Sequence, residues 1–149
     1  FVMSNLQIAF LFGQLERTTY VTQTRSSVWY SYHEKLKELE TAGCLTRPSI
    51  EPGASINGHI YYVRLASRFN RACVINSLKC EGINVLSHYE PLHCSPAGIK
   101  FGRISGKLDI TKDASSKLIR LPIWPQISEE QINKVVNQLE RVLLSDQHA

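Results

Sequence analysis

The chain is 149 residues long, 43% of them hydrophobic and 20% charged, which is the composition of an ordinary globular domain and excludes disordered and fibrous proteins. Its longest apolar run, from Ile8 to Phe12, is far shorter than the ~20 residues of a membrane-spanning helix, so we expect no membrane partner. The net charge is +4, and the basic excess lies between positions 91 and 127, which favours an anionic partner. The four cysteines follow no metal or disulfide pattern, so we expect reduced thiols and a cytoplasmic protein.

The first predicted element is a long amphipathic helix. From Ser4 to about Glu40 the chain has no proline, and apolar residues recur at helical spacing in its second half. Gly13 is a candidate bend in this helix, and Gly43 a C-terminal stop. A helix of this length exceeds what a small domain packs within itself, so residues 1–46 are expected to connect to a second structural unit. Because the first residue is Phe rather than Met, we expect an N-terminal part of the protein to precede it.

A loop and a β-α-β unit follow this helix. Residues 47–57 are rich in Pro, Gly and Ser and predict a loop. The β-branched and aromatic run 59–65 predicts a strand, residues 68–80 a helix, and residues 83–89 a second strand. The residues that the helix is expected to bury are Ala72, Ile75 and Leu78.

The C-terminal part of the chain ends with its clearest helix. Residues 90–108 predict a loop with one turn of helix near 96–100, residues 111–119 a short helix, and residues 120–124 an extended piece whose proline suits a sheet edge. The capping box 128–131 predicts the start of the last helix. Its expected buried face is Ile132, Val135, Val136, Leu139, Val142 and Leu143.

These elements predict an α/β (α+β) fold in which a long N-terminal helix leads into a small two-layer domain. Residues 1–46 form the connecting helix and residues 47–57 the loop. Residues 58–149 form the small C-terminal domain, whose short sheet is covered by helices.

Polar side chains gather where the second predicted strand ends. His88, Tyr89 and His93 follow that strand in a proline-containing segment. The carboxyl ends of strands in α/β sheets are common ligand positions, and imidazole and phenol groups both donate and accept hydrogen bonds. The residues alone leave two interpretations open: they bind a polar ligand, or they cap the strand and hydrogen-bond a loop carbonyl.

A metal site and a phosphate-binding loop are two further hypotheses. Cys80, His88, His93 and Cys94 lack the short paired spacings of structural zinc sites, so we predict no metal. The glycine-rich loop 98–107 carries basic residues that either reach phosphate oxygens or form a solvated surface. These are Lys100, Arg103 and Lys107. No nucleic-acid-binding motif is visible, so we predict no nucleic acid partner.

Four motifs occur in order along the chain. They are Ser4-Asn-Leu-Gln-Ile-Ala-Phe10 with Gln14-Leu-Glu16, Asn57-Gly-His-Ile-Tyr-Tyr-Val-Arg-Leu65, Ser87-His-Tyr-Glu-Pro-Leu-His93 followed by Ser95-Pro-Ala-Gly98, and Leu118-Ile-Arg-Leu-Pro-Ile123. In this order they resemble the C-terminal part of the DegT-type sugar-nucleotide aminotransferases, which are pyridoxal-phosphate enzymes of fold type I. The third motif is most similar to the branch that acts on dTDP-4-oxo-6-deoxyglucose.

This resemblance implies an aminotransferase that moves an amino group, from glutamate, to the C4 ketone of a dTDP-linked deoxysugar in polysaccharide biosynthesis. It also implies a homodimer and the fold of the C-terminal domain of fold type I aminotransferases. The chain departs from the family pattern at Asn5, where Glu is usual, and at Ile8, where a small alanine is usual. The residues that the resemblance places on the sugar-nucleotide side are His88, Tyr89, His93 and Arg120.

The same resemblance limits the chemistry of this chain. In the family, the Schiff-base lysine, the aspartate facing the pyridinium nitrogen and most phosphate-binding groups belong to a large domain upstream of the first residue here. Transamination needs that lysine and that carboxylate. We therefore predict no catalytic residue in this chain, no covalent binding of pyridoxal phosphate and no turnover by the chain alone. The alternative is a non-catalytic module, for sugar-nucleotide binding or assembly, that kept the small-domain fold.

Overall fold

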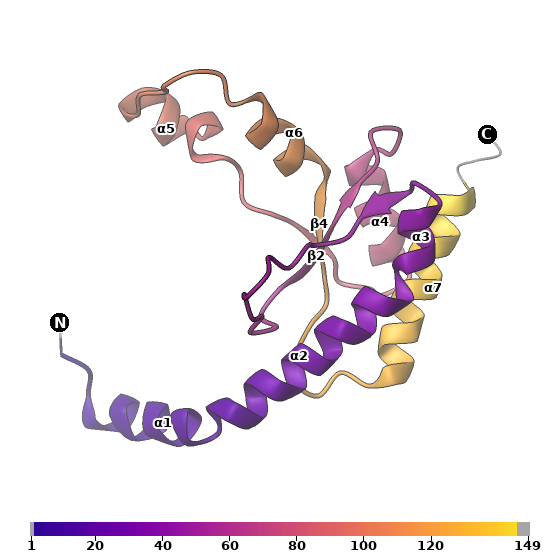
Figure 1. Ribbon diagram of the computed structural model, residues 1–149. Helices are drawn as coiled ribbons and strands as arrows, with labels where there is room; N and C mark the ends of the chain where they lie inside the picture. Colours follow the sequence, from indigo (N-terminus) through magenta and orange to yellow (C-terminus); the bar gives the residue numbers. More distant parts are fainter. Residues whose placement is uncertain (1, 146–149) are drawn as a thin grey trace.

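Helices and short strands follow one another along the chain (Figure 1). The computed structural model describes residues 2–145. The helices are α1 (Asn5–Glu16), α2 (Thr18–Lys35), α3 (Lys37–Thr41), α4 (Arg71–Cys80), α5 (Pro96–Phe101), α6 (Asp109–Lys117) and α7 (Glu129–Ser145), with a 3-10 turn at Leu92–Cys94. The strands are β1 (Leu45–Thr46), β2 (Tyr61–Leu65), β3 (Leu86–Ser87) and β4 (Leu118–Leu121).

The four strands form one antiparallel sheet in the order β1-β2-β4-β3. Strand β4 pairs with β2, where Tyr62 lies opposite Arg120, and with β3, where Leu86 lies opposite the same Arg120. Strands β2 and β3 therefore run parallel to each other with β4 between them. The predicted β-α-β succession is present as a split unit. The prediction that residues 120–124 form a sheet edge is wrong, because β4 is an inner strand that ends just before the proline.

Helices cover one face of this sheet and build the core. Along β2, Tyr61, Val63 and Leu65 are buried, whereas Tyr62 and Arg64 lie on the opposite, open face. Helices α2, α4 and α7 supply the facing side chains, and all of these belong to a single core cluster. The predicted fold, a small antiparallel sheet covered by helices, is therefore confirmed.

The last helix agrees with the sequence prediction in its start and in its buried face. The Ser128 backbone N–H donates to Gln131 Oε1 at 2.9 Å, and the Gln131 backbone N–H donates to Ser128 Oγ at 3.2 Å. These two bonds are the predicted capping box. Of the six predicted apolar positions, five are buried and Val142 is half-buried.

The N-terminal helix differs from its prediction. The chain leaves the helical conformation at Arg17 and again at Leu36, so three helices replace one. Gly13 lies inside α1 and is not the bend. Helix α1 buries no residue, whereas α2 packs against the core through Val28 and Trp29, so the chain changes direction before the packed part begins. A strand at 45–46 was not predicted because two residues carry no periodicity.

Other boundaries shift because pairing with distant strands overrides local preference. Helix α4 starts at Arg71 after the N-cap Asn70, and it buries Val74 and Leu78 while Ala72 is exposed. The second predicted strand shortens to two residues, and the end of the predicted helix 111–119 is the start of β4. The predicted turn of helix near 96–100 is present as α5.

Residues 90–117, here called the α5–α6 arm, project away from the sheet (Figure 1). The arm is fixed at α6, where the Arg71 guanidinium donates to the Ser115 carbonyl oxygen. Arg64 on β2 also lies 3.4 Å from Asp113 in an ion pair. Helix α1 extends away from the packed body at the lower left of Figure 1, apart from the arm at the upper left. Within residues 2–145, no helix combines the length and apolar character needed to cross a membrane.

Candidate functional site

His88 and Tyr89 line a pocket between the end of β3 and the base of the α5–α6 arm. We call it the His88 pocket, and its volume is about 280 Å³. Both side chains are exposed, Tyr89 by 78%, so they are available to a ligand. The lining residues are Arg71, His88, Tyr89, Glu90, Pro91, Cys94, Lys112, Ser115 and Ser116.

The cations of this pocket come from two helices. Arg71 is the first residue of α4, where the Asn70 side chain caps the helix by accepting from the Ala72 backbone N–H at 3.0 Å. Lys112 belongs to α6, and the bond from Arg71 to the Ser115 carbonyl holds the two helices together. Sequence reasoning missed both residues, because only the packing of the arm brings them beside His88.

His93 takes a different position from the one expected. It follows the pocket in the 3-10 turn and does not line it. Its Nε2 atom is buried and has no hydrogen-bond partner among residues 2–145. Because this nitrogen is buried, it is not available to a ligand in the pocket.

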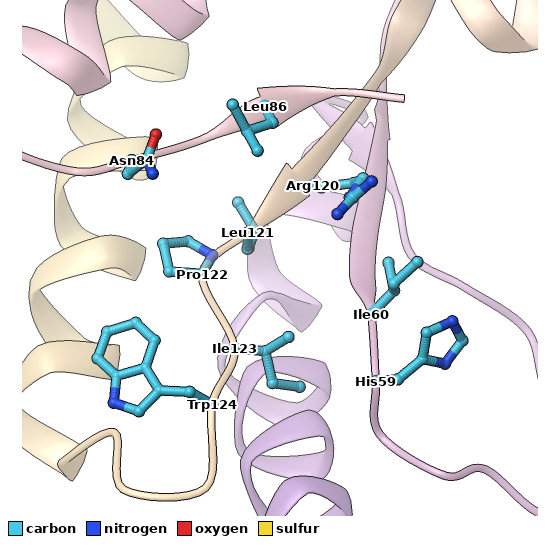
Figure 2. A pocket seen from close by; sticks show the side chains of 9 residues that line it. All are labelled: His59, Ile60, Asn84, Leu86, Arg120, Leu121, Pro122, Ile123 and Trp124. Atoms are coloured by element: carbon cyan, nitrogen blue, oxygen red, sulfur yellow. The ribbon is translucent and has the colours of Figure 1, made fainter. Parts of the chain in front are cut away.

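Arg120 lies in a second pocket, shown in Figure 2, on the open face of the sheet. We call it the Arg120 pocket, and its volume is about 260 Å³. Trp124 stands across the hollow from Arg120 in Figure 2 and is 40% exposed. The lining residues are His59, Ile60, Asn84, Leu86, Arg120, Leu121, Pro122, Ile123 and Trp124.

The structure therefore divides the four predicted residues. It brings His88 and Tyr89 together, places Arg120 in a separate pocket, and leaves His93 outside both. The basic residues of the glycine-rich loop, Lys100, Arg103 and Lys107, are exposed and do not line the His88 pocket. Their surroundings match the solvated surface that the sequence left as an alternative.

A metal ion has no obvious place in the described part of the chain. Between residues 2 and 145, no three side chains of the His, Cys, Asp or Glu type gather closely enough to hold one. Cys80, His88, His93 and Cys94 accordingly form no common site. All four cysteines of the sequence lie in this range, and none is in a disulfide.

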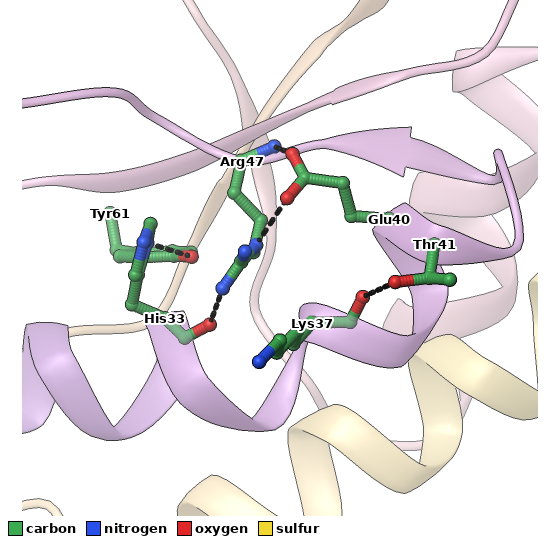
Figure 3. Close-up of polar contacts among 6 residues, drawn as sticks. All are labelled: His33, Lys37, Glu40, Thr41, Arg47 and Tyr61. Atoms are coloured by element: carbon green, nitrogen blue, oxygen red, sulfur yellow. Dashed lines mark hydrogen bonds and ion pairs between the residues drawn. The ribbon is translucent and has the colours of Figure 1, made fainter.

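A polar cluster, shown in Figure 3, ties α2 and α3 to Arg47, the residue that follows β1. The Arg47 backbone N–H and Nε each donate to the Glu40 carboxylate at 2.7 Å, and its guanidinium also donates to the His33 carbonyl oxygen. Burial tends to raise the pKa of Glu40, but these bonds from Arg47 outweigh it and hold that pKa below its usual value. Burial, followed by the Arg47 charge, lowers the pKa of His33, whose Nδ1 lies 3.5 Å from the Tyr61 hydroxyl.

Comparison with known proteins gives the family. The profile of the DegT/DnrJ/EryC1/StrS aminotransferase family matches residues 1–140. The chain belongs to this family.

Two relatives match nearly the whole chain. The erythromycin biosynthesis sensory transduction protein EryC1 of Saccharopolyspora erythraea is 27% identical over 139 residues, which cover 93% of this chain and 36% of that protein. The dTDP-3-amino-3,4,6-trideoxy-alpha-D-glucose transaminase of Micromonospora megalomicea is 23% identical over 144 residues, covering 95% of this chain and 37% of that enzyme.

A solved structure has the same fold. DesV of S. venezuelae, crystallised in complex with a ketimine intermediate, superposes with a TM-score of 0.80 at 25% sequence identity. The match covers 91% of this chain and 35% of DesV. The chain thus spans little more than a third of the length of the relatives that it matches.

Proposed function

We propose that the chain is the C-terminal part of a pyridoxal-phosphate-dependent sugar-nucleotide aminotransferase. The substrate proposed is a dTDP-linked 4-oxo-6-deoxyhexose, and the amino donor is glutamate. The observation that carries this proposal is the family match over residues 1–140. A relative that is by name a dTDP-amino-sugar transaminase supports the nucleotide. We further propose a cytoplasmic homodimer serving polysaccharide biosynthesis.

The described residues do not by themselves make up a pyridoxal-phosphate site. A Schiff-base lysine is activated by desolvation or by a neighbouring cation. Among residues 2–145, Lys35 and Lys117 are held in ion pairs with Glu129 and Asp113, and the other lysines are exposed to solvent. Lys112 is the one that lines the His88 pocket, and it too is exposed. We therefore assign covalent attachment of the cofactor to residues outside this chain.

Within that enzyme, we assign His88 and Tyr89 to direct contact with the sugar nucleotide. Both are exposed at the mouth of one pocket, and both donate and accept hydrogen bonds. Arg120 contacts an acidic group of a substrate from its own pocket. His93 supports the loop that carries His88 and does not contact the substrate through Nε2, because that atom is buried.

The substrate assignment is tested with the product of the full reading frame that contains this chain. We expect it to aminate dTDP-4-oxo-6-deoxyglucose with glutamate, measured by mass spectrometry of the amino sugar. His88→Ala should lower kcat/KM at least about tenfold, the effect of one lost contact worth about 1.4 kcal/mol. Leu92→Ala is the matched control, since Leu92 is 85% exposed in the same loop and does not line the pocket. Unchanged kinetics in His88→Ala would remove His88 from the site.

The cofactor assignment is tested on the 149-residue chain. Titration with pyridoxal phosphate followed by borohydride should leave no stoichiometric lysine adduct. An adduct trapped on Lys112 would contradict the assignment and place the cofactor in the His88 pocket. The alternative function, a non-catalytic module, instead predicts that this chain binds dTDP-sugars as tightly as the full-length product does.

A further inference from the structure

The charges of the His88 pocket differ from those that the sequence indicated. The predicted phosphate-binding loop lies elsewhere, and the pocket instead contains Arg71 and Lys112. Glu90 is the acidic residue that lines the same hollow. Two cations against one carboxylate leave the pocket positive, so an anion is the complementary ligand.

The two cations are held by different parts of the fold. The Arg71 guanidinium donates to the Ser115 carbonyl oxygen, which orients it across the junction of α4 and α6. Because a guanidinium carries five N–H donors, this bond leaves most of them available to a ligand. Lys112 is exposed, and its ammonium makes no ion pair within the described residues.

The two serine hydroxyl groups of the pocket do not donate to a ligand. Ser115 Oγ donates to the Lys112 carbonyl oxygen at 3.0 Å, and Ser116 Oγ donates to the Asp113 carbonyl oxygen at 2.8 Å. Both protons are thus directed at the backbone of α6, and the hydroxyl oxygens offer lone pairs. Recognition of an anion in this pocket falls to the two cations, with His88 and Tyr89 beside them.

We propose that Arg71 and Lys112 bind the diphosphate of the sugar nucleotide in the His88 pocket. That the ligand is a sugar nucleotide rests on the proposed function. That the ligand is an anion rests on the charged residues that line the pocket. A diphosphate has two anionic groups, and the pocket presents one cation from α4 and one from α6. The Arg120 pocket, in contrast, is lined by a single full charge and lacks this pairing. The sugar would then lie toward His88 and Tyr89, which line the same hollow.

The test uses the 149-residue chain and inorganic pyrophosphate at low ionic strength, because salt screens exposed charges. Binding is followed by the chemical-shift changes of backbone amides around His88. Lys112→Gln should weaken binding by about fivefold, the upper range for an exposed charge pair. Glu90→Gln should tighten binding by about twofold to threefold, since it removes a repelling charge of the same exposed kind. Lys79→Gln, an exposed lysine on α4 outside the pocket, is the matched control and should change nothing.

Opposite effects of the Lys112 and Glu90 variants separate an electrostatic site from a structural role, because a structural role would not improve binding in either variant. The proposal is overturned if pyrophosphate does not saturate the chain below about 5 mM, the concentration range in which the solution stays at low ionic strength. It is equally overturned if the Lys112 and Lys79 variants bind alike, or if the Glu90 variant binds more weakly.

A second measurement separates this proposal from the proposed function. In the full-length product, Lys112→Gln should raise the KM for the dTDP-oxo-sugar by about fivefold and leave the KM for glutamate within twofold. If the chain binds pyrophosphate as expected but the full-length product aminates no dTDP-oxo-sugar, the proposed function fails and the anion site stands. If amination occurs and the sugar KM of the variant is unchanged, the proposed function stands and the anion site is rejected.

Discussion

Gly58, at the end of the loop before β2, offers a direct test of how that loop packs against α2. Its φ is +64°, a left-handed conformation that costs a non-glycine residue about 1–2 kcal/mol. A Cβ added there would also lie 2.5 Å from the carbonyl carbon of Arg25 and 2.6 Å from the backbone nitrogen of Ser26. These are backbone atoms of a packed helix, so relief requires moving the helix, which adds about 1–3 kcal/mol by analogy with overpacking. Gly58→Ala should therefore cost about 2–5 kcal/mol.

Gly53→Ala is the matched control for this measurement. Gly53 has a φ of +81°, but nothing lies within 4 Å of its added Cβ. Gly53→Ala should lose only the cost of the left-handed backbone conformation. The reduced freedom of the unfolded alanine chain offsets about 0.4–1 kcal/mol of that cost. At about 2–4 °C per kcal/mol, thermal melting followed by circular dichroism should separate the two variants by several degrees. Equal melting temperatures would refute the close approach between Gly58 and α2.

Three further changes test other parts of the fold. Burial, and then the Arg47 charge, lower the pKa of His33 in the folded state. As the pH falls, His33 is therefore protonated in the unfolded chain before it is protonated in the folded one. Stability should therefore be complete above about pH 6.5 and fall as the pH drops through the lowered pKa, and His33→Gln should flatten this slope in urea titrations. Tyr32→Phe removes the bond that the hydroxyl donates to the Pro122 carbonyl oxygen at 2.9 Å and should cost about 1 kcal/mol in the same titration. Ser128→Ala removes the N-cap of α7 and should also cost about 1 kcal/mol, measured by thermal melting.

Each of these three predictions has its own contradicting result. A slope that persists in the His33 variant would assign the acid sensitivity to another group. A neutral Tyr32→Phe variant would show that the carbonyl oxygen finds another partner, such as water. An unchanged melting temperature in Ser128→Ala would show that the start of α7 frays without affecting the core.

The elements predicted well from the sequence are those whose pattern is local. The apolar face of α7 repeats over about three turns, and β2 alternates over five residues with a buried, exposed, buried pattern. The elements predicted poorly depend on distant partners. Strand β3 has two residues and pairs with β4, and β4 itself was divided between a predicted helix and an extended piece. Strands this short have too little periodicity to be recognised before their neighbours are known.

The candidate site shows the same division. His88 and Tyr89 are adjacent in the chain, so their shared pocket followed from one sequence motif. Arg120 was grouped with them by resemblance, but the pairing of β4 directs it to another pocket on the open face. Arg71 and Lys112 are far apart in sequence and meet only through the Arg71 bond to the arm, which no local pattern predicts.

The position of β4 between β2 and β3 also determines the order in which the domain is able to fold. Strand β2 pairs with β1 on one side and β4 on the other, whereas β3 joins the described sheet through β4. As the ribosome synthesises the chain, β2, α4 and β3 emerge first, yet β3 has no strand to pair with until residue 121 has appeared. Such pairing between distant segments is slow, because the intervening chain must be closed into a loop first. The arm lies in that intervening chain and carries exposed apolar side chains. These side chains are therefore exposed to solvent in the nascent chain before β4 pairs with β2 and β3, which is the stage at which a folding chain is prone to aggregate.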